Sequence, residues 1–299
     1  MSRRTSGARF VAVVALALVA LAGCSAGTSR ASTTSTTEPR SAPSTVLPRG
    51  TTDLVSMPTD RTFWFGDAAG SLFRVHLRSV TVGNLGGGQV AAFEGTVTNL
   101  LRGAASWHPD AVLRMGTTST SLSGGTTTRV RGGASAPFAL ASRRIPSSAA
   151  VGRATLIFGP AGTNQSIVAL ASGGATRSEA PVEHVVPTAA IRLVPGATAQ
   201  VERSVLYPRY GDGRVGQRRL VVYLAVTATF PDPNHLVLLH PSLITPDGSS
   251  QSVGDRVVAP PGAHLTEFAV INPPIAGRYR LAFLEMTDQV KSGIDFEVR

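Results

Sequence analysis

The sequence predicts an all-β fold with two tandem antiparallel β-sandwich domains behind an export signal and a tether. Three observations lead to this prediction. After residue 51, short apolar stretches alternate with polar residues in period two, which is typical of half-buried strands. Several residue patterns occur twice, in the same order along the chain. No stretch after the signal has the pattern of an amphipathic helix.

The first 23 residues have the three parts of an export signal. Arg3, Arg4 and Arg9 give a positive start, and 13 apolar residues follow from Phe10 to Ala22. This run is too short to span a bilayer core, which takes about 20 residues. A charged start, a short apolar core and small residues at its end together predict a cleaved signal over residues 1–23.

The signal ends in Leu21-Ala22-Gly23-Cys24, which contains the one cysteine of the chain. This motif resembles the lipobox of bacterial lipoproteins, and the arginine-rich composition is typical of the actinobacterial type. The resemblance implies lipidation of Cys24, cleavage just before it and anchoring at the extracytoplasmic face of the cell membrane. Two or three acyl chains hold a protein there firmly, whereas one does not. Two alternatives stay open: a plain secretory signal with an unrelated cysteine, and twin-arginine export.

Residues 24–50 are dominated by Ser, Thr, Pro and Gly and contain almost no large apolar side chains. Such a segment buries too little apolar surface to offset the loss of chain entropy on folding. It therefore predicts a disordered tether between the lipid anchor and the folded part.

The net charge is +10, and removal of the three signal arginines leaves +7. Nucleic-acid-binding proteins concentrate such charge in a dense patch, but these arginines are scattered, with short pairs such as Arg143-Arg144 and Arg218-Arg219. The pattern therefore predicts no nucleic-acid partner. It is typical of a solvated basic surface, with anionic headgroups or acidic envelope polymers as the alternative.

Period-two stretches define the expected strands. In the first, Phe73, Val75 and Leu77 face one way and polar residues face the other. Longer stripes extend from Leu220 to Phe230 and from Ile294 to Val298. Many short strands between turns are typical of a sandwich or barrel. The expected architecture resembles tandem immunoglobulin-like domains of bacterial surface proteins, although the Cys…Trp…Cys core of antibody domains is missing.

Five short patterns recur at offsets of 125 to 132 residues. The pairs are Arg78-Ser79-Val80 with Arg203-Ser204-Val205, Thr96-Val97-Thr98 with Thr227-Ala228-Thr229, His108-Pro109 with His240-Pro241, Phe138-Ala139-Leu140 with Phe268-Ala269-Val270, and Gly152-Arg153 with Gly277-Arg278. They keep their order, so we predict two copies of one β-domain at 51–175 and 186–299. Residues 176–185, which follow Gly173-Gly174 and contain Pro181, form the expected linker, and because it is short we expect the copies to touch.

The second copy contains an insertion from Tyr207 to Arg214. Loops on a rigid sandwich often bind partners, and Tyr and Arg are favoured interface residues. Tyr207, Arg209, Tyr210 and Arg214 therefore form a candidate binding loop. The alternative is an ordinary hairpin tip whose aromatic side chains pack on their neighbours.

Phe63-Trp64-Phe65 is the densest aromatic cluster and has no counterpart in the second copy. Aromatic side chains bury large areas, so we expect it in the core, on an extra edge strand or as a cap. An exposed contact with a ligand or membrane is the alternative.

Patterns that carry chemistry are weak in this chain. Gly211-Asp212-Gly213-Arg214-Val215-Gly216 matches a dinucleotide motif, but a strand follows it where a helix is needed, so we expect a hairpin turn. Histidines show no metal-ligand spacing, and no nucleophile elbow or Ser-x-x-Lys motif is present. Asn164-Gln165-Ser166 fits a glycosylation sequon, which means little in a bacterium. The sequence predicts no metal, no cofactor and no catalytic residue.

These observations favour a lipid-anchored cell-envelope protein that is not an enzyme and acts as a binding or scaffold module for an envelope protein or polymer. A carrier that holds a small apolar ligand or lipid within the sandwich cores is the alternative. An envelope hydrolase is the third, since two carboxylates from distant strands also make a glycosidase site.

Overall fold

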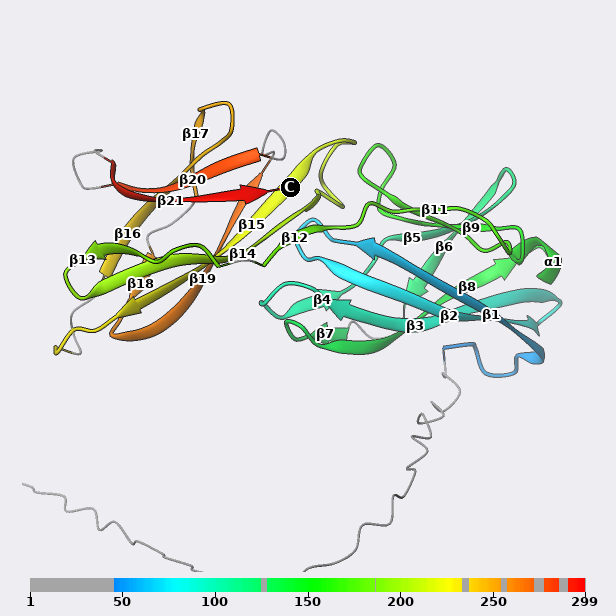
Figure 1. Ribbon diagram of the computed structural model, residues 1–299. Coiled ribbons are helices and arrows are strands. Elements are labelled where there is room, and N and C mark those ends of the chain that lie inside the picture. Colours follow the sequence, from blue (N-terminus) through cyan, green and yellow to red (C-terminus); the bar gives the residue numbers. More distant parts are fainter. Residues whose placement is uncertain are drawn as a thin grey trace, which may run out of the picture. The chain divides into compact units, whose positions relative to one another are not determined.

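The computed structural model describes residues 46–124, 128–185, 187–232, 237–253, 257–271, 277–284 and 290–298. The predicted all-β class is confirmed, because the regular elements of the described chain are antiparallel strands apart from the four-residue helix α1 (Ser148–Val151) (Figure 1). The signal, Cys24 and most of the predicted tether lie outside the described residues.

Residues 52–177, called the first half below, form one nine-stranded sheet in the order β1-β2-β3-β8-β6-β5-β9-β10-β11. Its strands are β1 (Thr52–Phe65), β2 (Phe73–Leu85), β3 (Gly88–Asn99), β5 (Ala111–Met115), β6 (Thr118–Gly124), β8 (Ser135–Ile145), β9 (Thr155–Phe158), β10 (Ser166–Ala169) and β11 (Thr176–Arg177). A separate ribbon pairs β4 (Ala105–Trp107) with β7 (Thr128–Val130). The sheet curls on itself, since the ring of Phe63 on β1 lies 4.7 Å from that of Phe158 on β9.

Residues 182–298, the second half, form two sheets. One contains β12 (Val182–His184), β14 (Ala197–Pro208), β15 (Arg218–Ala228) and β19 (Gly262–Ile271) in that order, with β13 (Ile191–Val194) also paired to β14. The other runs β17 (Ser250–Ser252), β16 (Val237–Ile244), β20 (Gly277–Leu284) and β21 (Val290–Val298), and β18 (Val257–Ala259) pairs with β16. One core lies between these sheets and includes Leu224, Leu281 and Phe296.

The strand orders of the two halves correspond. The run β1-β2-β3-β8 matches β12-β14-β15-β19, and β6-β5-β9-β10 matches β17-β16-β20-β21. Four of the five recurring patterns fall on or beside strands in equivalent places. The fifth pattern, His-Pro, directly follows β4 in the first half. In the second half it lies within β16, at the point where the pairing of β16 changes from β18 to β20.

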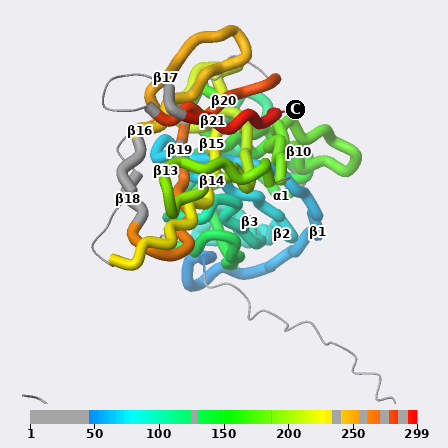
Figure 2. The backbone as a smooth tube through the Cα atoms, turned by 60° about the vertical axis from the view of Figure 1, so that its left-hand side comes forward, coloured from blue at the N-terminus to red at the C-terminus, as the bar shows by residue number. Residues whose placement is uncertain are grey.

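Residues 43–299 form one compact unit, so the division into two domains at 176–185 stays a prediction. The expected linker is itself structured, because Thr176 and Arg177 form β11 and Val182–His184 form β12. The expected contact between the halves is present and centres on β14 and β15, where Val205 and Val221 belong to the core of the first half. Figure 2 shows these two strands next to each other, with β19 beside β15.

Strands β14 and β15 have apolar side chains on both faces. Leu206 and Val222 belong to the core of the second half, whereas their neighbours Val205 and Val221 belong to the core of the first half. Alternate side chains of a strand point to opposite faces of its sheet. This sheet is therefore buried on both sides where β14 and β15 approach their hairpin, and the two cores share that part as a common wall.

The aromatic cluster of residues 63–65 lies on β1, the edge strand that its place in the sequence suggested. Phe63 is fully buried and Phe65 is 3 % exposed, so the core interpretation is confirmed for both. Trp64 lies between them and is half-buried. Its backbone is held by Ser178, whose Oγ accepts from Trp64 N at 2.8 Å and donates to Trp64 O at 2.9 Å.

Candidate functional site

The four residues of the candidate binding loop lie on the hairpin that joins β14 to β15. The strands pair as far as Pro208 and Arg218, and residues 209–217 form the turn. Gly211 and Gly216 have φ values of 77° and 86°, a region that favours glycine. The expected glycine hairpin turn is therefore present, and no helix follows it.

The two tyrosines of this hairpin point into the first half. Tyr207 is 2 % exposed and donates from Oη to Gly70 O at 2.9 Å. Tyr210 is 3 % exposed, packs against Phe65 and donates from Oη to Glu179 O at 3.0 Å. Both side chains are thus used within the chain, as in the packed-hairpin alternative, and they present no face to an external partner.

Burial also fixes the charge state of these tyrosines. It raises the pKa of Tyr210 to about 12, against smaller opposing effects from Ser178 and Ser166. Burial raises the pKa of Tyr207 still further, although the neighbouring Arg219 partly offsets the effect. Both phenols are therefore neutral donors at physiological pH, as their hydrogen bonds to carbonyl groups require.

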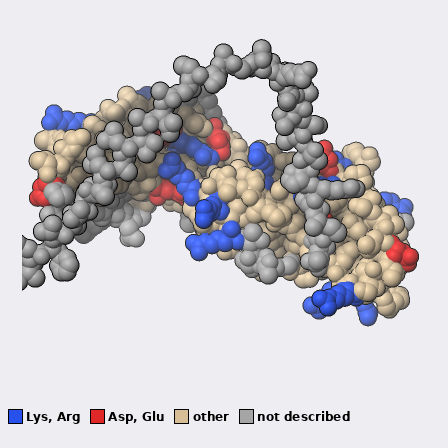
Figure 3. Space-filling model, turned by 90° about the horizontal axis from the view of Figure 1, so that it is seen from below, with Lys and Arg blue, Asp and Glu red and all other residues tan. Residues whose placement is uncertain are grey.

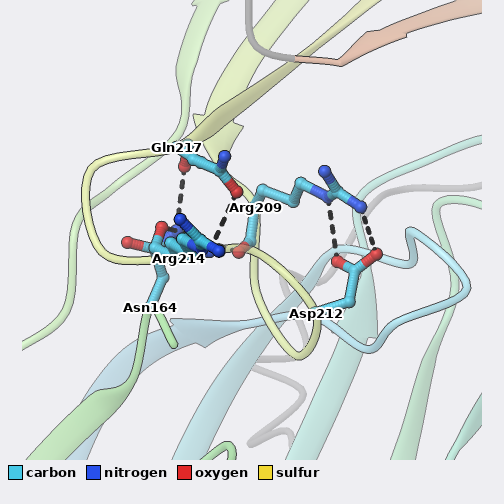
Figure 4. A network of polar contacts seen from close by, with 5 residues as sticks. All are labelled: Asn164, Arg209, Asp212, Arg214 and Gln217. Atoms are coloured by element: carbon cyan, nitrogen blue, oxygen red, sulfur yellow. Dashed lines mark hydrogen bonds and ion pairs between the residues drawn. The ribbon is translucent and has the colours of Figure 1, made fainter. Parts of the chain in front are cut away.

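The two arginines of the loop differ in their contacts. Arg209 makes a bidentate pair with Asp212, with Nε to Oδ1 at 3.0 Å and Nη2 to Oδ2 at 2.6 Å (Figure 4). This hydrogen bonding lowers the pKa of the Asp212 carboxyl. Arg214 is exposed and its backbone N–H donates to Gln217 Oε1 at 2.9 Å. Of the four predicted residues, Arg214 alone is classed as exposed.

Asn164 of the first half holds the hairpin in place (Figure 4). Its Nδ2 lies 2.9 Å from Arg209 O, 3.1 Å from Arg214 O and 2.8 Å from Gln217 O. Its Oδ1 accepts from Gly216 N at 3.0 Å, and its own N–H donates to Gly213 O at 3.0 Å. Because Nδ2 carries two protons, the three carbonyls share them. One amide side chain thus satisfies most of the turn's inward backbone groups.

Sequence reasoning treated Asn164 only as part of a glycosylation sequon and missed this role. The residue lies between β9 and β10, about fifty positions before the hairpin that it binds. No local pattern connects them. The one available signal was that Asn side chains often hydrogen-bond backbone groups in turns. That tendency does not indicate which turn Asn164 would bind.

Close backbone approach completes the contact. A Cβ on Gly211 would lie 2.6 Å from Ala68 N, and a Cβ on Gly70 would lie 1.3 Å from Arg219 Nη1. The hairpin therefore lies directly on the turn of residues 66–71 in the first half. That turn is closed by Asp67, whose Oδ1 accepts from Ser71 N at 3.0 Å.

A charged cluster stands beside this contact. Arg203 Nη2 lies 2.6 Å from Glu183 Oε1 and 3.2 Å from Leu100 O, so it joins the second half to the first. The guanidinium carbons of Arg203 and Arg102 lie 5.3 Å and 5.9 Å from the ring centre of Tyr223. This distance suits cation–π attraction. The contact between the halves, which we call the joint, thus combines apolar, hydrogen-bonded and charged elements.

The joint has the chemistry of a structural contact. Within the described ranges, no group of three or more His, Cys, Asp or Glu side chains is placed to hold a metal ion. His108 and His240 are both exposed. In the part of the chain from residue 46 onward that the structure describes, no helix is long and apolar enough to cross a membrane. No model of a known protein family and no curated protein sequence matches the chain.

Proposed function

We propose that the protein is a lipid-anchored cell-envelope protein that acts as a non-enzymatic binding or scaffold module. The lipobox at Leu21–Cys24 supports the anchor, as argued from the sequence above. Two immunoglobulin-like units would then stand on the outer face of the membrane and engage an envelope protein or polymer.

The observation that carries this proposal is the joint. Strands β14 and β15 are buried on both faces next to their hairpin, and Asn164 and the two tyrosines hold this hairpin against the first half. A contact of this kind leaves little freedom between the halves. Loops from both halves are then held at fixed separations, which is what a scaffold or a two-sided binding surface requires.

The anchor is tested by growing cells with a clickable palmitate analogue. We expect the wild-type chain to incorporate the label and the Cys24→Ala variant to lose it. Label in the variant, or none in the wild type, would exclude lipidation at this residue. Ser25 to Ala is the matched control, because it leaves Cys24 in place.

The binding function is tested by affinity purification from envelope extract, with immobilised residues 25–299 as bait and mass spectrometry of proteins and lipids. We expect one protein or polymer to be enriched. A Leu281→Asp bait, which disrupts a buried position, controls for adhesion to unfolded chain. A lipid recovered without protein would favour the carrier instead. If nothing is enriched and the bait hydrolyses an ester or glycan panel, the proposal is wrong and the protein is an enzyme.

A further inference from the structure

Charge is divided unequally between the two halves. Residues 51–177 contain 11 arginines and 5 acidic residues, a balance of +6. Residues 178–299 contain 11 basic and 12 acidic residues, a balance of −1. Figure 3 shows one face of the molecule, where basic side chains gather in several clusters and acidic ones lie between them.

Among the described residues, the arginines of the first half form no ion pair with a carboxylate. The arginine–carboxylate pairs among the described residues all use arginines of the second half, namely Arg203, Arg209, Arg218, Arg278 and Arg280. No described carboxylate lies within ion-pair distance of an arginine between residues 51 and 177. Positive charge that is not neutralised locally attracts anionic surfaces.

Part of this charge lies beside exposed apolar side chains at one end of the nine-stranded sheet. Leu54 and Val55 on β1 are 59 % and 55 % exposed, and both are large aliphatic side chains. Leu54 lies over Gly83 of β2, because a Cβ on Gly83 would be 2.7 Å from Leu54 Cδ2.

The same row of residues continues across the sheet to two arginines. Gly83 pairs with Val90 of β3. Opposite Val90, β8 has a register shift that leaves Arg143 and Arg144 between the paired residues Ser142 and Ile145. Both arginines are exposed. With strands spaced about 4.8 Å apart, this row spans about 15 Å. We call it the basal edge.

The chain reaches the folded unit at this edge. β1 begins at Thr52, two residues before Leu54, and Arg49 just before it is exposed. Cys24 precedes Val46, the first described residue, by 22 positions, so Val46 lies within about 80 Å of Cys24 whatever path the chain takes, and the basal edge follows a few residues later. An anchor at Cys24 thus keeps this edge, of all parts of the fold, closest along the chain to the bilayer.

We propose that the basal edge contacts an anionic lipid bilayer, with Arg49, Arg143 and Arg144 at the headgroups and Leu54 and Val55 in the interfacial layer. Basic residues near an anionic surface and a small apolar insertion act together in this way. The contact rests on the proposed anchor, and it orients the molecule with its basic half toward the membrane and its second half outward.

The test uses residues 25–299, which contain the whole compact unit without lipid, and sedimentation with vesicles. Vesicles contain phosphatidylcholine alone or with roughly one third phosphatidylglycerol, at low salt and at about 0.15 M salt. We expect binding to the anionic vesicles that weakens with salt. Arg143→Gln with Arg144→Gln should reduce the association constant about 30-fold, from about fivefold per arginine. Leu54→Ser with Val55→Ser should reduce it roughly tenfold.

The matched control is Arg192→Glu, an exposed arginine of the second half whose substitution changes the net charge by the same amount as the Gln pair. It should bind nearly as the wild type does, and circular dichroism should show all variants folded. The inference would be overturned if Arg192→Glu lost as much vesicle affinity as the Arg143→Gln, Arg144→Gln pair, or if the wild type bound neutral vesicles as well as anionic ones. Binding to an acidic polymer but not to vesicles would also overturn it. Residues 25–299 carry no lipid, so a failure to bind anionic vesicles would count against the membrane contact alone. A failure of Cys24 to incorporate the palmitate label would instead count against the proposed lipid anchor.

Discussion

Tyr210 and Asn164 hold one hairpin from two directions, and their contacts differ in kind. Asn164 satisfies backbone groups of the turn, whereas Tyr210 fills an apolar site with its ring and bonds Glu179 O at its rim. Sequence reasoning placed Tyr210 in a candidate binding loop because of its residue type, with a packed hairpin tip as the alternative. It did not identify what the tyrosine anchors to, because Phe65 and Glu179 lie 145 and 31 positions away.

The buried tyrosines predict a loss of stability at alkaline pH. The pKa of Tyr210 is about 12 in the folded chain and about 10 when unfolded. Below pH 10 both states hold the proton and the full contribution is present. Between pH 10 and pH 12 only the unfolded state releases it, so the free energy of unfolding falls by up to about 1.4 kcal/mol per pH unit for each such tyrosine.

Urea unfolding at pH 9, 10 and 11 measures this slope. Tyr210→Phe should be less stable than the wild type at pH 9 by about 1 kcal/mol, from the lost hydrogen bond, but should show a shallower fall toward pH 11. Gln165→Ala, a neighbouring change without a titrating group, should keep the wild-type slope. An unchanged slope in Tyr210→Phe would show that its phenol ionises equally in both states.

At the scale of elements, the two faces of β14 and β15 show where pattern reading succeeds and where it stops. The stripe of Leu220, Val222 and Leu224 was recognised as a buried face and is buried. The intervening Val221 and Tyr223 are equally buried, against the first half. A continuous apolar run is the signal of a strand buried on both faces, and residues 220–225 contain one. The sequence could not show what covers the second face, because that depends on how the halves dock.

The glycines of the hairpin provide a test of the docked turn. Gly211 and Gly216 share left-handed φ values, but a Cβ would meet atoms of the first half only at Gly211, since nothing lies within 4 Å of the Cβ position at Gly216. Gly216→Ala should cost about 1 kcal/mol from backbone strain alone. Gly211→Ala adds a clash with Ala68 N and the Asp67 carbonyl carbon, so we expect a cost of roughly 2–4 kcal/mol. Thermal or urea unfolding of both variants measures the difference in stability. Equal losses of stability would mean that the turn of residues 66–71 moves aside and that the added methyl group causes no clash.

At the scale of the whole molecule, the period-two stretches led to a correct expectation of the all-β class, since side-chain periodicity and turn residues are local features. The division into two copies of one domain stays a prediction. Contact between the halves was expected from the short linker, but the residues of the joint were not predicted, because they form pairs such as Tyr207 with Gly70, separated by 137 positions. The shared wall of β14 and β15 implies that the two cores unfold together. A linker of a few residues between independent domains would give two separate transitions.

Both tryptophans, Trp64 and Trp107, lie in the first half, so their fluorescence reports that half alone. Leu281→Ala opens the core of the second half and should cost about 2–5 kcal/mol. If the halves are coupled, it lowers the urea midpoint seen by tryptophan fluorescence as much as the one seen by far-UV circular dichroism. An unchanged fluorescence midpoint would show that the second half unfolds independently. Val168→Ala in the first core is the matched control. It should lower the urea midpoint by both probes, whether or not the halves unfold together.

Because the two cores share this wall, the first half cannot complete its core until part of the second half has been synthesised. Residues 52–177 leave the ribosome first, but their core lacks Val205, Tyr207, Tyr210, Val221 and Tyr223 until some 46 further residues are made. At about 5–20 residues per second, the docking surface for the hairpin stays open for several seconds. During that time the hairpin of a neighbouring chain fits the same surface, because the sequences are identical. Two such chains would exchange second halves, and this fold therefore carries a route to a domain-swapped dimer within its own assembly.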